Sequence, residues 1–153
     1  EFTVKDIEEI YDMRILLESY AIKNSVKTLT SKNIQELMEI LQLLVKYYEK
    51  SDLTHYIEVD TQLHQYIITL GGNSLIVDTY RRIYSQSQQF RIYSLTTQRR
   101  FDDSLTEHRN IVENICSGNW KEADRINKIH LALAREEIIQ HFETKKTSEQ
   151  ENE

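Results

Sequence analysis

The sequence predicts an all-α domain, and three observations lead to that fold class. The chain of 153 residues contains no proline and only three glycines, the residues that most often interrupt helices and form tight turns. Apolar residues recur three and four positions apart over long stretches, as on the buried face of a helix. Hydrophobic residues make up 39% and charged residues 29%, which is typical of a folded helical domain rather than a disordered chain.

Six helices are expected, and their limits follow from capping and stop residues. The expected ranges are 4–29, 31–50, 53–70, 74–93, 104–116 and 119–143. The expected N-caps are Thr3, Thr30 or Ser31, Asn73 and Asp103. Gly71 and Gly72 end the third helix and Gly118 ends the fifth, because glycine takes the left-handed conformation of a helix end. Asn119, with Glu122 three residues later, resembles a capping box for the last helix.

The two ends of the chain differ from the middle. Residues 1–144 are expected to form one helical domain, and residues 145–153, KKTSEQENE, a disordered tail without an apolar anchor. The first methionine is Met13, and helical periodicity is already present at Ile7. The chain is therefore expected to be a fragment from which an N-terminal domain has been removed.

Charge and cysteine content exclude several classes of function. A net charge of −6 and a pI near 5.4 argue against direct binding of nucleic acid by this segment. The single cysteine, Cys116, excludes an internal disulfide and fits a reducing compartment, so a cytoplasmic location is expected. No apolar run approaches the length of a membrane span, so no membrane partner is expected.

Four polar side chains fall on stripes that should face the core. Asp60 and His64 lie one turn apart on the third helix, His108 lies on the fifth, and His130 lies on the sixth. Burying a neutral imidazole alone costs about 1–3 kcal/mol, and burying an ionised aspartate costs more. Two interpretations remain open: each side chain is hydrogen-bonded separately in the core, or all four bind one metal ion.

If the metal interpretation holds, three nitrogens and one oxygen suit Zn²⁺, and Ni²⁺, Mn²⁺ or Co²⁺ are alternatives. The other two histidines are not expected to be ligands. His55 lies about half a turn round the helix from His64, beside polar residues. His141 lies three turns beyond His130, which is about 16 Å at 1.5 Å per residue.

Arg14 is the other charged residue on an apolar stripe, and it also has two interpretations. Glu18 follows one turn later, so the pair is either an ion pair on a helix flank or part of a binding site. In a binding site the Arg14 guanidinium would hold a carboxylate ligand through two hydrogen bonds. Arg81 and Arg82 on the fourth helix are expected to face solvent.

Several short motifs occur in a recognisable order. They are Arg14-x-x-Leu17-Glu18, Asp60-x-x-x-His64 followed by Gly72-Asn73, Glu107-His108-Arg109-x-Ile111, and Gly118-Asn119-x-x-x-Ala123 with His130 after it. No single motif is specific, but this order and spacing, over nearly the whole chain, resemble the FCD domain. That domain is the C-terminal effector-binding domain of FadR-type regulators in the GntR family.

The resemblance implies an antiparallel bundle of six or seven helices that encloses a metal and ligand cavity. It implies metal ligation by Asp60, His64, His108 and His130, and a contact between Arg14 and a small carboxylate effector. It also implies a homodimer whose effector alters DNA affinity. In that family an N-terminal winged helix-turn-helix binds DNA, and nothing in this chain matches it, so DNA is expected to be bound only through a missing domain.

Three classes of function are therefore compared: an effector sensor, a metal-dependent hydrolase-like enzyme, and a metal-free helical dimerisation module. An enzyme would need a general acid or base beside the metal. Glu107 adjoins His108 but is expected to point to another side of the helix, and no HExxH motif or activated nucleophile is present. The sequence favours the sensor and argues against an enzyme.

Overall fold

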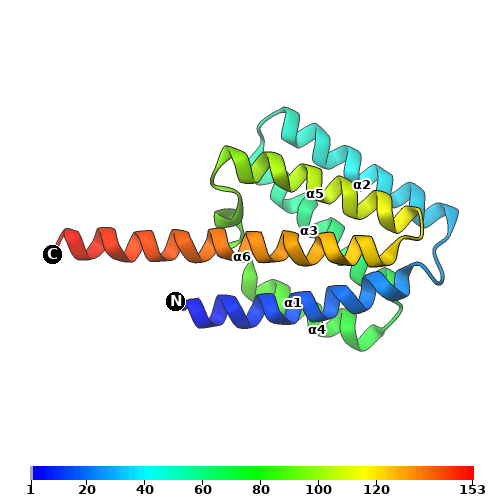
Figure 1. Ribbon diagram of the computed structural model, residues 1–153, viewed down its shortest axis with the longest axis horizontal. Helices are drawn as coiled ribbons and strands as arrows, with labels where there is room; N and C mark the ends of the chain where they lie inside the picture. Colours follow the sequence, from blue (N-terminus) through cyan, green and yellow to red (C-terminus); the bar gives the residue numbers. More distant parts are fainter. Residues whose placement is uncertain (1) are drawn as a thin grey trace.

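The computed structural model describes residues 2–153 and consists of helices (Figure 1). Its elements are α1 (Val4–Ser25), α2 (Ser31–Glu49), α3 (Leu53–Leu70), α4 (Ser74–Ser87), the 3-10 helix η1 (Arg91–Leu95), α5 (Gln98–Cys116) and α6 (Trp120–Glu151). No strand occurs between residues 2 and 153. The predicted all-α fold class and the number of α-helices are confirmed.

The long helix α6 organises the bundle. It packs against α1 on one side and α5 on the other, and it runs antiparallel to both (Figure 1). Helix α3 contacts α1, α2 and α4, while α2 also packs on α5. Four helices, α1, α3, α5 and α6, are thus brought around one interior region, and each of them contributes polar side chains to it.

The capping residues at three helix starts act as predicted. The Thr3 and Thr30 hydroxyls accept hydrogen bonds from backbone N–H groups of α1 and α2, each at 3.1 Å. Asn73 Oδ1 accepts from two backbone N–H groups at the start of α4. Gly72 has a φ of +73°, the left-handed conformation predicted for the end of α3. Gly71 allows the chain to pass α1 closely, because a Cβ there would lie 2.8 Å from the Cα of Ala21.

Several predicted boundaries are wrong, and local hydrogen bonds explain the differences. Helix α1 ends at Ser25 rather than residue 29, because residues 26–29 must turn before the extended cap at Thr30. Helix α4 ends at Ser87, and η1 follows where the fourth helix was expected to continue. Helix α5 begins six residues early, at Gln98, because Thr97 rather than Asp103 caps it. Asn119 makes no side-chain capping bond.

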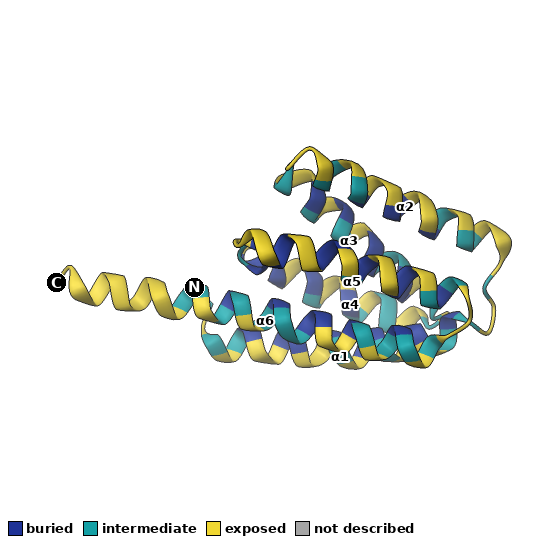
Figure 2. Ribbon diagram, turned by 45° about the horizontal axis from the view of Figure 1, so that its top comes forward, coloured by how far each residue is buried: buried dark blue, intermediate teal, exposed yellow. Residues whose placement is uncertain are grey.

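The C-terminal residues are helical in the structure, whereas the sequence predicted a disordered tail from 145 to 153. Helix α6 continues to Glu151, past the end of the bundle (Figure 1). Every residue from 143 onward is exposed, so these turns of α6 have no packing partner (Figure 2). The predicted lack of an apolar anchor is therefore correct, although the backbone adopts a helix.

Two groups of apolar side chains form the core. The larger draws on all six α-helices and includes fully buried Leu37, Leu63 and Ile111. The smaller includes Ile7, Tyr11, Phe90, Leu131 and Ile138 and joins α1 to α6. Helices α1, α3, α5 and α6 also carry buried polar residues. In the described chain, no helix combines the length and apolar character needed to cross a membrane.

Candidate metal centre

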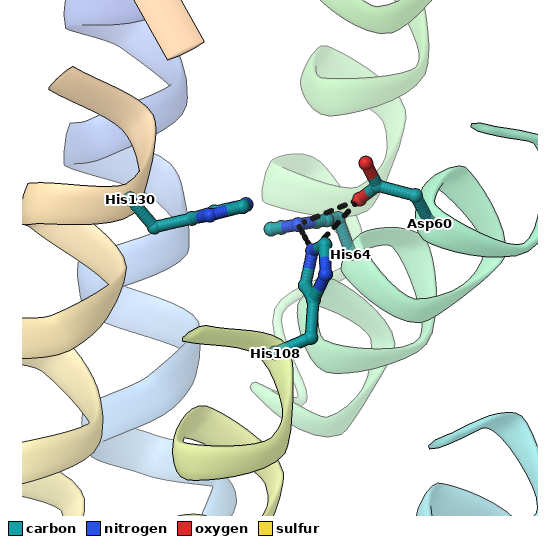
Figure 3. A group of neighbouring side chains, drawn as sticks. All are labelled: Asp60, His64, His108 and His130. Carbon is teal, nitrogen blue, oxygen red and sulfur yellow. Dashed lines mark hydrogen bonds and ion pairs between the residues drawn. The ribbon is translucent and has the colours of Figure 1, made fainter. Parts of the chain in front are cut away.

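Asp60, His64, His108 and His130 lie together in the interior of the bundle (Figure 3). Each offers one donor atom, and these four atoms lie within 4.8 Å of one another. Asp60 Oδ1 is 3.1 Å from His64 Nε2 and 3.0 Å from His108 Nε2, and the two nitrogens are 3.3 Å apart. The three imidazoles are 4% exposed or less. The structure thus brings together the four residues that the sequence singled out.

Each imidazole uses its Nδ1 atom for a contact with the protein. His64 Nδ1 lies 2.5 Å from Glu18 Oε1, and His130 Nδ1 lies 2.6 Å from Glu107 Oε1. His108 Nδ1 lies 3.1 Å from the Tyr56 hydroxyl. When Nδ1–H donates to such an oxygen, the Nε2 of a neutral imidazole carries a lone pair. This arrangement orients a histidine for metal binding.

The Asp60 carboxylate, like the three imidazoles, has a donor atom available for a metal ion. Its Oδ1 atom is buried, yet it makes no well-formed hydrogen bond within residues 2–153, although two imidazole nitrogens are about 3 Å away. A buried carboxylate oxygen without a partner costs free energy. A single cation among the four donor atoms, which lie within 4.8 Å of one another, would give this oxygen a partner. The donor set therefore fits a divalent metal ion.

Burial and nearby charges set the protonation of these groups. Burial, together with the neighbouring His108, lowers the pKa of His130 to about 4, so this imidazole is neutral at pH 7. Burial acts in the same direction on His64, but the Glu18 and Asp60 carboxylates outweigh it and raise the pKa of His64. Burial disfavours ionised Asp60, yet His108 and His64 hold the pKa of that carboxyl well below its ordinary value.

Glu18 connects four helices at one carboxylate. It accepts hydrogen bonds from Arg14 Nε at 3.0 Å, from the Tyr80 hydroxyl at 3.0 Å and from Asn127 Nδ2 at 3.3 Å, besides its contact with His64. These partners come from α1, α4, α6 and α3. The Glu18 side chain is fully buried, and the charges of Arg14 and His64 overcome the effect of burial and lower its pKa. Glu18 therefore remains an anion within the bundle.

A cavity lies beside the four residues. Its walls include Arg14, Asp60, Arg91, Arg100, Ser104 and His130. It offers about 10 Å³ to the centre of a water molecule, which is room for about one water. The Arg14 side chain forms the predicted ion pair with Glu18 and also lines this cavity, and its Nη2 atom is buried without a hydrogen-bond partner in the described chain. The Arg14–Glu18 ion pair is thus present, but both side chains are buried in the interior rather than on a helix flank. The role of Arg14 in ligand binding stays a prediction.

The remaining histidines and the arginine pair lie away from this centre. His55 is half exposed and contacts Asp52 at 2.6 Å, and the ring of His141 stacks on Tyr93 with 3.9 Å between centroids. Arg81 and Arg82 are both exposed. These placements agree with the expectations for the four residues.

The expected direction of the Glu107 side chain is wrong. It was expected to point away from the centre, but its side chain contacts His130 and forms two 3.0 Å bonds to Arg100. Arg100 was also missed, because it lies between the expected fourth and fifth helices, 74–93 and 104–116. The spacing Arg100, Ser104, His108 places three polar residues on one helical face, and this signal in the sequence could have identified the inward direction.

Comparison with known proteins agrees with this architecture. The model of the FCD domain family matches residues 9–133. Two Bacillus subtilis (strain 168) proteins are each 25% identical: the HTH-type transcriptional regulator YdhC, over 92% of this chain and 58% of that protein, and the gluconate operon transcriptional repressor, over 73% and 45%. The chain therefore spans about half the length of these curated relatives.

Two solved structures of one protein are also similar. The Zn²⁺-bound FCD domain of TM0439 superimposes with a TM-score of 0.76 at 26% identity, and its metal-free form with 0.80 at 25%; each comparison covers 94% of this chain and 99% of that one. The names of these relatives describe transcriptional regulators. With the family model matching most of its length, the chain belongs to the FCD domain family of GntR-type transcriptional regulators.

Proposed function

We propose that this chain is the effector-sensing domain of a bacterial transcriptional regulator that binds a small organic acid beside a metal ion. Asp60, His64, His108 and His130 would hold one divalent ion, and Arg14 would contact the acid. DNA would be bound by a winged helix-turn-helix domain that precedes α1 in the whole protein. The observation that carries this proposal is the convergence of four donor atoms within 4.8 Å in the bundle interior.

Zn²⁺ is the ion that we propose. Three imidazole nitrogens and one carboxylate oxygen form a typical zinc donor set, although Ni²⁺, Mn²⁺ and Co²⁺ accept the same donors. The Zn²⁺-bound form of TM0439, a structural neighbour, supports this choice. A bound ion would supply a Lewis-acidic position for one carboxylate oxygen of the effector.

The residues of the chain would complete the binding site. Arg14 lines the cavity, and its buried Nη2 atom has no hydrogen-bond partner within residues 2–153, so it has a hydrogen bond available for a second carboxylate oxygen. Because Arg14 Nε remains bonded to Glu18, the guanidinium is held in place before the ligand arrives. The name of one relative, a gluconate operon repressor, also links a family member to an operon named for a carboxylic acid.

Helix α1 is the element that would transmit binding. It carries Arg14 and Glu18 and packs against α3, α4 and α6. A ligand that favours one position of Arg14 would shift the population of α1 orientations in proportion to its difference in affinity for them. That shift would change the placement of the DNA-binding domain and so its affinity for DNA.

Carboxylate binding should depend on metal. We expect short-chain carboxylates to bind zinc-loaded protein at least about tenfold more tightly than protein stripped with a chelator, because one carboxylate oxygen loses its partner when the ion is removed. Isothermal titration calorimetry on both forms measures this difference. Equal affinity for the loaded and stripped forms would refute the proposed mechanism.

Zinc affinity should fall as pH decreases. Metal binding requires neutral imidazoles, so protons compete with the ion below the histidine pKa of about 6.5. Glu18 and Asp60 outweigh burial and raise the pKa of His64, so its competition begins at higher pH; the pKa of His130, lowered to about 4, delays competition there. We expect zinc affinity to fall by about tenfold per pH unit once His64 is protonated. Calorimetric titrations from pH 8 to pH 5 test this, and a constant affinity would contradict it.

A further inference from the structure

We propose that Glu107, held in place by Arg100, is a positioning residue of the metal centre and orients His130 as its fourth ligand. Neither Glu107 nor Arg100 donates an atom to the ion. Their role rests on the proposed function, because it exists only if Asp60 and the three buried imidazoles hold a metal ion. It concerns how one of these imidazoles is made able to bind, and not what else binds beside it.

His130 reaches the centre from a different side than the other three candidate ligands. The donor atoms of Asp60, His64 and His108, on α3 and α5, lie 3.0 to 3.3 Å from one another. His130 comes from α6, on the other side of the cluster (Figure 3). Its ring centroid is 5.4 Å from that of His64 and 4.4 Å from that of His108, and no hydrogen bond within residues 2–153 joins it to the other three. The other ligands therefore do not fix the direction of this ring.

Glu107 supplies the contact that fixes the His130 ring. Its Oε1 atom lies 2.6 Å from His130 Nδ1, and this is the one hydrogen bond that the imidazole makes within residues 2–153. When Nδ1–H donates to the carboxylate, the lone pair of the neutral ring lies on Nε2, the nitrogen that is free to bind an ion. Without this acceptor the proton can occupy Nε2 instead, and that tautomer offers no lone pair there. Glu107 thus selects both the orientation and the tautomer that a metal ligand needs.

Arg100 holds the Glu107 carboxylate in turn. Its Nη1 and Nη2 atoms donate to Glu107 Oε2 and Oε1, each at 3.0 Å, so two parallel hydrogen bonds fix both oxygens. The two residues are seven positions apart on α5, about two helical turns, and therefore lie on the same side of that helix. The Arg100 and Glu107 side chains are only 7% and 15% exposed. Water and salt therefore screen this pair less than a surface ion pair, and its geometry is kept.

The other two imidazoles do not depend on Glu107. His64 Nδ1 contacts the Glu18 carboxylate of α1. His108 Nδ1 contacts the Tyr56 hydroxyl of α3. Loss of the Glu107 carboxylate should therefore disturb the ligand from α6 and leave the ligands from α3 and α5 oriented. An ion pair that only braced α5 would change the stability of the protein but would have no effect that depends on the α6 imidazole.

A double-variant cycle in zinc affinity tests this role. Glu107→Gln keeps the size of the side chain but removes its charge and one acceptor oxygen, so zinc affinity should fall by about 10–100-fold, the usual effect of losing the partner of a ligand. In a His130→Ala background the same change should alter zinc affinity by less than about twofold, because Glu107 acts through His130. Zinc titrations of the four proteins, in competition with a chelator, measure both effects. Glu113→Gln, an exposed carboxylate on the same helix, is the control and should bind zinc as the wild type does.

The position of the proton on His130 gives a second test, which needs no variant. Proton–nitrogen correlation spectra of metal-free wild-type protein near neutral pH should show this ring as one tautomer, with its proton on Nδ1.

The outcomes separate this role from the function beneath it. A proton on Nε2 of His130 in the wild type overturns the role even if the variants do not fold. Zinc affinity of Glu107→Gln equal to that of the wild type also overturns it, as does an equal loss with and without His130. In each of these cases the sensing function stands. If zinc does not bind to the wild-type chain, both proposals fall together.

Discussion

Replacement of His108 by alanine should abolish metal binding and, with it, carboxylate binding. His108 Nε2 lies 3.0 Å from Asp60 Oδ1 and 3.3 Å from His64 Nε2, so its loss removes one of four donors from the centre of the site. Losing a residue that only orients a ligand typically lowers metal affinity by about 10–100-fold. Loss of a ligand should exceed that range. Calorimetric zinc titration of the purified variant measures the effect.

A matched control uses another histidine of the same chain. His55→Ala removes an imidazole from α3 that is half exposed and contacts Asp52 rather than the centre. We expect this variant to bind zinc as the wild type does. Circular dichroism should show the same helical content for both variants, because neither imidazole belongs to the apolar core. Zinc affinity within twofold of wild type for His108→Ala would exclude this residue as a ligand.

Replacement of Glu18 by alanine should lower the free energy of unfolding by about 3–5 kcal/mol in metal-free protein. This is the usual cost of removing one partner from a buried ion pair, because the remaining charge is left uncompensated. Arg14 would lose its anion, and His64, Tyr80 and Asn127 would lose an acceptor. Urea denaturation followed by circular dichroism gives the value. Glu8→Ala on the exposed side of the same helix is the control and should change stability by less than about 0.5 kcal/mol.

A double-variant cycle identifies the source of that loss. If the buried Arg14–Glu18 pair dominates, Arg14→Met and Glu18→Gln should each destabilise the protein, and the double variant should be more stable than the sum predicts. The expected coupling between contacting residues is about 0.5–3 kcal/mol. Strict additivity of the two changes would show that the two side chains act independently, against the 3.0 Å contact between them.

The fold class could be predicted from the sequence because helix periodicity and capping are local properties. Thr3, Thr30 and Asn73 cap the helices that they were expected to cap. The start of α5 was misplaced because the helix has no apolar residue before Phe101, so periodicity could not locate its first turn. The end of α6 was misplaced because a helix without packing partners leaves no apolar pattern in the sequence.

The four clustered residues could be found because polar side chains on three apolar stripes stand out against leucine and isoleucine. Their partners could not be found in that way. Glu107 and Arg100 lie on a mostly polar part of α5, and their direction depends on how α6 packs against it. Arg91 begins a 3-10 helix, and the expected fourth helix, 74–93, extended into it. Its place in the cavity depends on tertiary structure, which one-dimensional spacing does not encode.

Crystals of untagged protein grown with zinc test the central claim directly, through anomalous diffraction at the zinc absorption edge. We predict one strong peak per chain within about 2.0–2.2 Å of an Asp60 oxygen and of a nitrogen from each of His64, His108 and His130. The absence of a peak among these four side chains, or a peak at a surface site alone, would contradict the account.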